Sequence, residues 1–204
     1  MLDVSALVLG LGLGLRHATD ADHVAVVSAM LQREPGALRA LRVAVLWGLG
    51  HTVSFLALGL LIVLGGVRIP ASFERAVELL VAAMLIGLGA WHLARGTGAS
   101  APTRAVSAKR PVAVGLVHGL AGSAGVALLT GATIHSRLCA TLYLALFGVG
   151  TVLGMALLTA ALSWPIAWAA RPHRPWSGWI FRLPGISSVG LGLLLGVECL
   201  RFWG

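Results

Sequence analysis

Apolar residues fill six segments of this chain, at about 4–31, 40–66, 73–93, 111–133, 138–163 and 184–203. A helix needs about 20 apolar residues to cross the hydrocarbon core of a bilayer, and all six segments reach that length. The 204 residues are 58% hydrophobic and only 11% charged, with a mean hydropathy of +0.92. The pattern therefore predicts an all-α polytopic membrane protein with six transmembrane helices.

A polar stretch interrupts the first of these segments. The eight residues from Arg16 to His23, RHATDADH, contain two carboxylates, one guanidinium and two imidazoles. An ionised side chain at the centre of a membrane helix costs roughly 2.5–3.5 kcal/mol on insertion scales. Packing against apolar neighbours does not compensate for that cost, so the stretch indicates a bound cation or a polar pathway.

The two halves of the chain resemble each other. Trp47-Gly48-Leu49-Gly50 matches Phe147-Gly148-Val149-Gly150 at an offset of 100, and His17 matches His118 at an offset of 101. A repeat of three spans must be inverted in the membrane, which is a common construction of transporters. We therefore expect two inverted three-helix repeats, at 1–94 and 111–204, joined by a polar linker at 95–110.

Basic residues lie between the apolar segments rather than on one continuous surface. The net charge is +8, and ten basic residues flank the odd-numbered loops against four on the other side. Such a distribution is typical of topology determinants and argues against nucleic-acid binding. It predicts an inner-membrane protein without a cleaved signal peptide, with cytoplasmic odd-numbered loops and both termini outside. Lys109 is the only lysine, and no GxxxxGK[ST] motif surrounds it, which excludes a Walker-type ATPase in this chain.

The spacing of the polar stretch predicts a break in the first helix. Successive residues of an α-helix are rotated by about 100°, so His17, Asp22 and His23 would face different sides of a continuous helix. They can reach one cation only where the helix unwinds between them, which is tolerated where backbone lines a cavity or is buried in protein. Arg16 and Asp20 are four residues apart, and we expect an ion pair between them that leaves Asp22 free.

Two further histidines lie at similar depths in other segments. Counted at 1.5 Å per residue, His17 and His23 lie roughly 20 and 10 Å from the cytoplasmic end of the first segment. His51 and His118 lie roughly 13 and 10 Å from the same side. We therefore expect four imidazoles and Asp22 to meet in the cytoplasmic half of the membrane. Imidazole and carboxylate ligands together suit Ni²⁺, Co²⁺ or Zn²⁺, and neutral imidazole is required, so binding should weaken at low pH.

At these residues the sequence resembles the nickel/cobalt transporter family of secondary permeases. Its RHAxDADH signature is met by Arg16 to His23, and its Gly-His-Ser/Thr step by Gly50-His51-Thr52. The chain is most similar to the short urease-accessory (UreH-like) and nickel-superoxide-dismutase-associated branch. It lacks the acidic second-half signatures of larger members, which resemble LGxDTATE and GMxxxD. The resemblance implies a metal permease. In it, His17, Asp22 and His23 are essential for metal handling, and His51 assists.

The sequence thus predicts transport of Ni²⁺ or Co²⁺ by alternating access, without enzymatic activity and with the transported ion in place of a cofactor. The expected metal residues are His17, Asp22, His23, His51 and His118, with Arg16, Asp20 and Thr52 in support. Efflux by the same scaffold and an intramembrane metalloenzyme that activates water or oxygen are the alternatives. The expected partners are the metal ion and the bilayer, with a second copy of the chain or a cytoplasmic metallochaperone left open.

Overall fold

The structure is a computed structural model that describes residues 4–31, 36–95, 107–121, 125–169 and 177–201. The described residues form helices joined by turns and short irregular connections, and they contain no strand. The helices are α1 (Val4–His17), α2 (Ala21–Leu31), α3 (Ala37–Val63), α4 (Ala71–Ala94), α5 (Lys109–His118), α6 (Gly125–Thr133), α7 (Arg137–Ala169) and α8 (Ser177–Arg201). Four of them, α3, α4, α7 and α8, are long and apolar enough to cross a membrane. Their number and length fit a polytopic membrane protein.

Two of the six predicted segments are divided. The first is split into α1 and α2, as its spacing predicted, and the segment 111–133 is split into α5 and α6, which the sequence analysis did not anticipate. After α5 the chain turns at once, because Leu120 N–H donates to Val117 O and Ala121 N–H to His118 O. Such bonds over three residues end an α-helix. The prediction of one continuous helix over 111–133, and with it a total of six helices, is therefore wrong.

The last two long helices extend beyond their predicted ends. α7 continues through Pro165 to Ala169, and α8 begins at Ser177, before Pro184. The sequence analysis ended the fifth segment at about residue 163 and began the sixth at about residue 184, with a linker between them. Most of this stretch is helical, and the described indoles of Trp164, Trp168 and Trp179 are 73%, 42% and 65% exposed, as anchors at a membrane surface would be.

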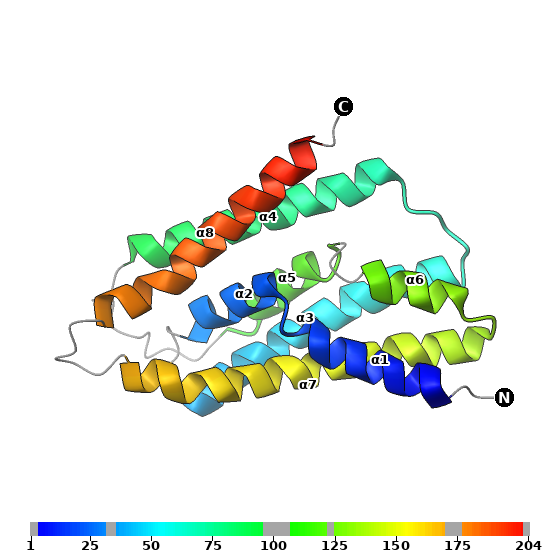
Figure 1. Ribbon diagram of the computed structural model, residues 1–204, viewed down its shortest axis with the longest axis horizontal. Coiled ribbons are helices and arrows are strands. Elements are labelled where there is room, and N and C mark those ends of the chain that lie inside the picture. Colours follow the sequence, from blue (N-terminus) through cyan, green and yellow to red (C-terminus); the bar gives the residue numbers. More distant parts are fainter. Residues whose placement is uncertain (1–3, 32–35, 96–106, 122–124, 170–176, 202–204) are drawn as a thin grey trace.

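The helices form two groups (Figure 1). α4 and α8 lie side by side and antiparallel. At one end of the pair His92 Nε2 donates a hydrogen bond to Phe181 O, and at the other end Cys199 Sγ donates one to Arg75 O. α1 lies along α7, and α3 crosses behind α5. α2 lies between α3 and α8, so the break after α1 is at the centre of the molecule.

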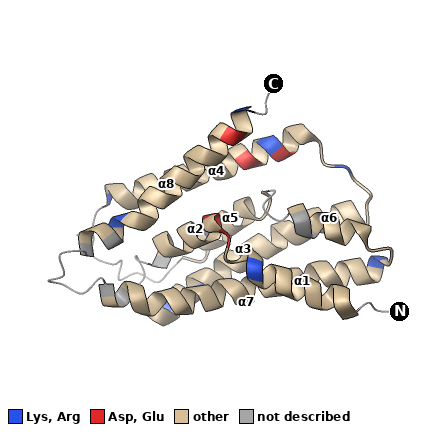
Figure 2. Ribbon diagram, viewed as in Figure 1, with Lys and Arg blue, Asp and Glu red and all other residues tan. Residues whose placement is uncertain are grey.

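The loops and termini divide the molecule into two ends. We call the end with the connections α2–α3, α4–α5 and α7–α8 the odd-loop end, and the end with α3–α4, α6–α7, Val4 and Arg201 the even-loop end. Figure 2 shows charged residues mostly near these two ends, except for an acidic stretch at the break between α1 and α2 and a basic position at the adjoining end of α1. The polar groups at that break therefore lie inside an apolar bundle.

Glycines bring the helix backbones into direct contact at this break. A Cβ on Gly14 would collide with Phe147 O, and one on Gly150 with Leu11 O, so α1 and α7 touch backbone to backbone. α3 and α5 approach in the same manner, because a Cβ on Gly115 would collide with Trp47 O and one on Gly50 with Val112 O. Small residues permit this close packing in membrane proteins.

Substitution of these glycines tests the packing. We expect Gly14→Ala to destabilise the protein by about 1–3 kcal/mol, because overpacking forces backbones apart. Gly12→Ala is the matched control, since nothing lies within 4 Å of a Cβ at that position of the same helix. It should be neutral or stabilising by up to about 1 kcal/mol through helix propensity. Thermal unfolding in detergent measures both, and equal stability of the two variants would contradict the packing.

Candidate metal centre

The break between α1 and α2 is a turn of three residues. Thr19 N–H donates to Arg16 O over 2.8 Å, Asp20 N–H donates to His17 O over 3.0 Å, and the Thr19 hydroxyl donates to Arg16 O over 2.6 Å. A threonine hydroxyl that donates a hydrogen bond to a carbonyl oxygen of the preceding helix competes with the backbone N–H groups, and so favours a turn over a continued helix. Asp20 immediately precedes α2, a position where aspartate is preferred. The predicted break is confirmed.

The turn brings two histidine rings into edge-to-face contact although the residues are six positions apart. The ring centroids of His17 and His23 are 4.4 Å apart, and His51 from the middle of α3 lies 5.3 and 5.2 Å from them. Nε2 of His17 and Nε2 of His51 are separated by 3.3 Å. All three side chains are buried, and each offers a ligand atom within 4.8 Å of the others. We call these three residues the histidine cluster.

Asp22 connects this cluster to the second half of the chain. Its Oδ1 accepts a hydrogen bond from His23 Nδ1 over 3.1 Å, and its Oδ2 accepts one from His118 Nε2 over 2.9 Å. Asp22, His23 and His118 form a second group of possible ligands within 4.8 Å, which shares His23 with the first. The structure thus brings together all five residues that the sequence analysis selected as metal residues.

The two aspartates determine which nitrogen of each ring is available. An ionised carboxylate can only accept, so Nδ1 of His23 carries its proton toward Asp22, and Nδ1 of His17 carries its proton toward Asp20, 2.8 Å away. Both rings therefore keep a lone pair on Nε2. Nε2 of His23 is buried and has no hydrogen-bond partner among the described residues. A carboxylate behind a histidine that offers its other nitrogen is the usual outer arrangement of metal-ligating imidazoles.

The predicted ion pair between Arg16 and Asp20 is wrong. Arg16 is exposed on α1, and the described residues contain no ion pair between the two. Spacing by four residues places side chains together only on a continuous helix. Here α1 ends at His17, so Asp20 lies in the turn and binds the His17 ring. The carboxylate thus orients a histidine and does not neutralise the arginine.

Thr52 and the depth of the site also differ in detail from expectation. The Thr52 hydroxyl donates to Gly148 O over 3.2 Å, so Thr52 supports the contact of α3 with α7 and does not face the imidazoles. His51 lies near the middle of α3, because that helix begins at Ala37 and not near residue 40.

One residue at the site was not anticipated from the sequence. The indole of Trp47 is fully buried, with its ring centroid 5.3 Å from that of His23 and 5.7 Å from that of His118. Its position four residues before His51 on α3 places it one helical turn nearer the odd-loop end. The match of Trp47 with Phe147 in the repeat was the signal in the sequence that could have identified it.

A comparison with known proteins identifies the family of this chain. The chain is 31% identical over 205 residues to the urease accessory protein UreH of Bacillus sp. (strain TB-90), a match that covers 93% of this chain and 90% of the relative. The chain belongs to the UreH family. No family profile matches it, and no solved structure matches it. The name of the relative gives UreH an accessory role to urease.

The unequal burial of the two aspartates generates a prediction for this UreH-family protein. Asp22→Leu removes the acceptor of two buried ring N–H groups, each of which costs about 1–3 kcal/mol when left unpaired. The Asp20 side chain is 41% exposed, so water can replace it at His17, and Asp20→Leu should cost less. Thermal unfolding in detergent without added metal compares the variants. Equal losses of stability would show that Asp22 does not hold the network.

Proposed function

We propose that this protein is a secondary permease that carries a divalent transition-metal cation, Ni²⁺ or Co²⁺, across the inner membrane. The observation that carries the proposal is the histidine cluster, three buried imidazoles whose ligand atoms lie within 4.8 Å of one another. Isolated buried histidines are commonly held by hydrogen bonds alone. Here two carboxylates bind the outer nitrogens, and the inner nitrogens converge.

The donor set favours a cation of intermediate softness. Imidazole with carboxylate suits Ni²⁺, Co²⁺ and Zn²⁺, whereas thiolates select softer ions. Both cysteines, Cys139 and Cys199, are buried outside the two ligand groups. Nickel is favoured by the resemblance of Arg16–His23 to the nickel/cobalt signature, and membership of the UreH family is consistent with it.

The fold supports transport rather than catalysis. Glycine contacts occur at equivalent positions in both halves: Gly14 on Phe147 corresponds to Gly115 on Trp47, and Gly150 on Leu11 to Gly50 on Val112. This correspondence favours two inverted repeats, which place a substrate between them near the membrane midplane. The histidine cluster comes from the first half, and His118 joins it from the second. Rocking of one half against the other would expose the cation to the two ends in turn.

Charge sets the proposed orientation. The excess of basic residues around the odd-numbered loops favours an orientation with the odd-loop end in the cytoplasm and both termini outside. The cation would exchange its water for imidazole nitrogens at the centre. It would then leave toward the other side when the halves move. Uptake and efflux use the same steps in opposite order.

Transport by purified variants tests the proposal. His17→Ala and His23→Ala should each reduce nickel flux into proteoliposomes at least about 100-fold, because each removes a ligand whose loss costs several kcal/mol of site assembly. His135→Ala is the matched control, since this exposed histidine precedes α7 and lies far from the cluster in the fold. It should transport at the wild-type rate.

A folding control accompanies the flux measurement. Size-exclusion elution and helical content of each variant must match wild type, so that lost flux reports on the site. Wild-type flux by His23→Ala would contradict the proposal. Accumulation of a chemical product without nickel flux would favour the metalloenzyme.

A further inference from the structure

The histidine cluster is covered by an aromatic ring on each side. On α3, His51 lies at the level of the cluster. Trp47 lies four residues before it, about 6 Å nearer the odd-loop end, and Phe55 lies four residues after it, about 6 Å nearer the even-loop end. The Trp47 indole contacts His23 and His118. On the opposite side, the Phe147 ring lies 5.3 Å from His17 and 4.6 Å from Phe55.

The two covering residues are equivalent in the repeat. Trp47-Gly48 and Phe147-Gly148 stand 100 residues apart, and the backbone carbonyl of each meets a glycine of the opposite half. Those glycines are Gly115 and Gly14. Each half therefore supplies one large ring to one side of the cluster. Neither ring offers a ligand atom that could replace the water of a divalent cation.

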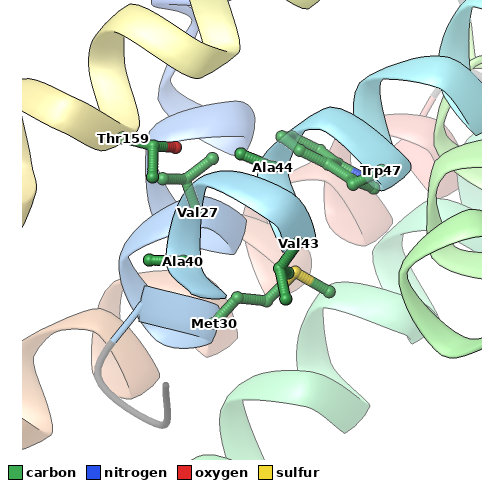
Figure 3. A pocket seen from close by; sticks show the side chains of 7 residues that line it. All are labelled: Val27, Met30, Ala40, Val43, Ala44, Trp47 and Thr159. Atoms are coloured by element: carbon green, nitrogen blue, oxygen red, sulfur yellow. The ribbon is translucent and has the colours of Figure 1, made fainter. Parts of the chain in front are cut away.

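The surroundings of the two rings differ. Beyond Trp47, toward the odd-loop end, lies a cavity with room for about one water molecule (Figure 3). It is lined by Trp47 and by Val27, Met30, Ala40, Val43, Ala44 and Thr159. The Thr159 hydroxyl is buried in this lining, without a hydrogen-bond partner among the described residues. A cation or its water would find this oxygen next on the path.

The other side is filled. Phe147 and Phe55 pack with Tyr143 and Leu144 into an apolar cluster in which every member is at least 98% buried. The tilted rings of Phe147 and Phe55, which contact each other, thus separate the histidines from the even-loop end. One ring separates them from the cavity.

We propose that Trp47 and Phe147 are the two barriers of the metal pathway, and that Trp47 alone closes the cluster toward the odd-loop end in this conformation. This inference rests on the proposed transport function. Displacement of this one indole joins the histidines to the cavity, where the Thr159 hydroxyl offers the cation an oxygen in place of one of its waters. The equivalent movement of Phe147 opens the other end only after Phe55 has also moved.

Binding kinetics distinguish a barrier from a supporting side chain. Nickel association with purified protein and its release into excess chelator are measured by stopped flow. Trp47→Ala should raise both rates about tenfold, equivalent to 1.36 kcal/mol of barrier, so that their ratio changes less than either rate. Phe147→Ala should change them less, because Phe55 still covers that side. Leu85→Ala, a fully buried truncation on α4 in the same apolar cluster as Trp47, should leave both rates unchanged.

A second variant keeps the proposal testable if Trp47→Ala does not fold. Ala44→Leu fills the cavity with a larger side chain and leaves Trp47 itself unsubstituted, and it should slow both rates. Faster release with unchanged association in Trp47→Ala, or a larger effect of Phe147→Ala, would overturn the proposal. So would wild-type rates in Ala44→Leu. If the wild-type protein itself binds no nickel, the proposed function fails instead.

Discussion

Hydrogen bonds from buried imidazoles to one carboxylate hold the centre of this protein together. Asp22 accepts from His23 and from His118, and so links the turn after α1 to the end of α5 in the other half. In an apolar bundle these polar groups have few alternative partners, and an unpaired buried group costs about 1–3 kcal/mol. The need to hydrogen-bond these buried groups explains why the rings converge and which of their nitrogens stay free. It also explains why two helices are interrupted at this level.

Close backbone packing makes that arrangement possible. His17 and His118 end α1 and α5, and both helices are pressed against a long neighbour through glycine, α1 on α7 and α5 on α3. Side chains larger than hydrogen at Gly14 or Gly115 would move these helix ends away from the centre. The glycines thus allow the two halves to approach closely. At this separation the Asp22 carboxylate can bind His23 and His118 at the same time. Long helices that need no break, α4 and α8, lie outside this arrangement.

Much of the site could be predicted because helix geometry is strict. A rotation of about 100° per residue forbids His17 and His23 from meeting on one helix, so a break was required. Depth counted along the chain brought His51 and His118 to the same level. The predicted ion pair between Arg16 and Asp20 was wrong because residues four apart lie together only on a continuous helix. The correctly predicted break ends α1 at His17, so Asp20 is not on the same helix as Arg16. Helix breaks without charged residues, as after His118, leave little trace in an apolar segment. The apolar pattern predicted α7 and α8 too short, because both helices continue past their apolar segments through Pro165 and Pro184, and proline is tolerated inside membrane helices.

A nickel-bound structure, with the ion located by anomalous scattering, tests the metal site most directly. The expected result is one strong peak within about 2.5 Å of imidazole nitrogens of His17, His23 and His51, with Asp22 still hydrogen-bonded to His118. Soaking with cobalt should give a peak at the same place. A nickel peak elsewhere, or none at saturating nickel while the histidine cluster keeps its hydrogen bonds, would contradict the assignment of this cluster as the transported cation's site.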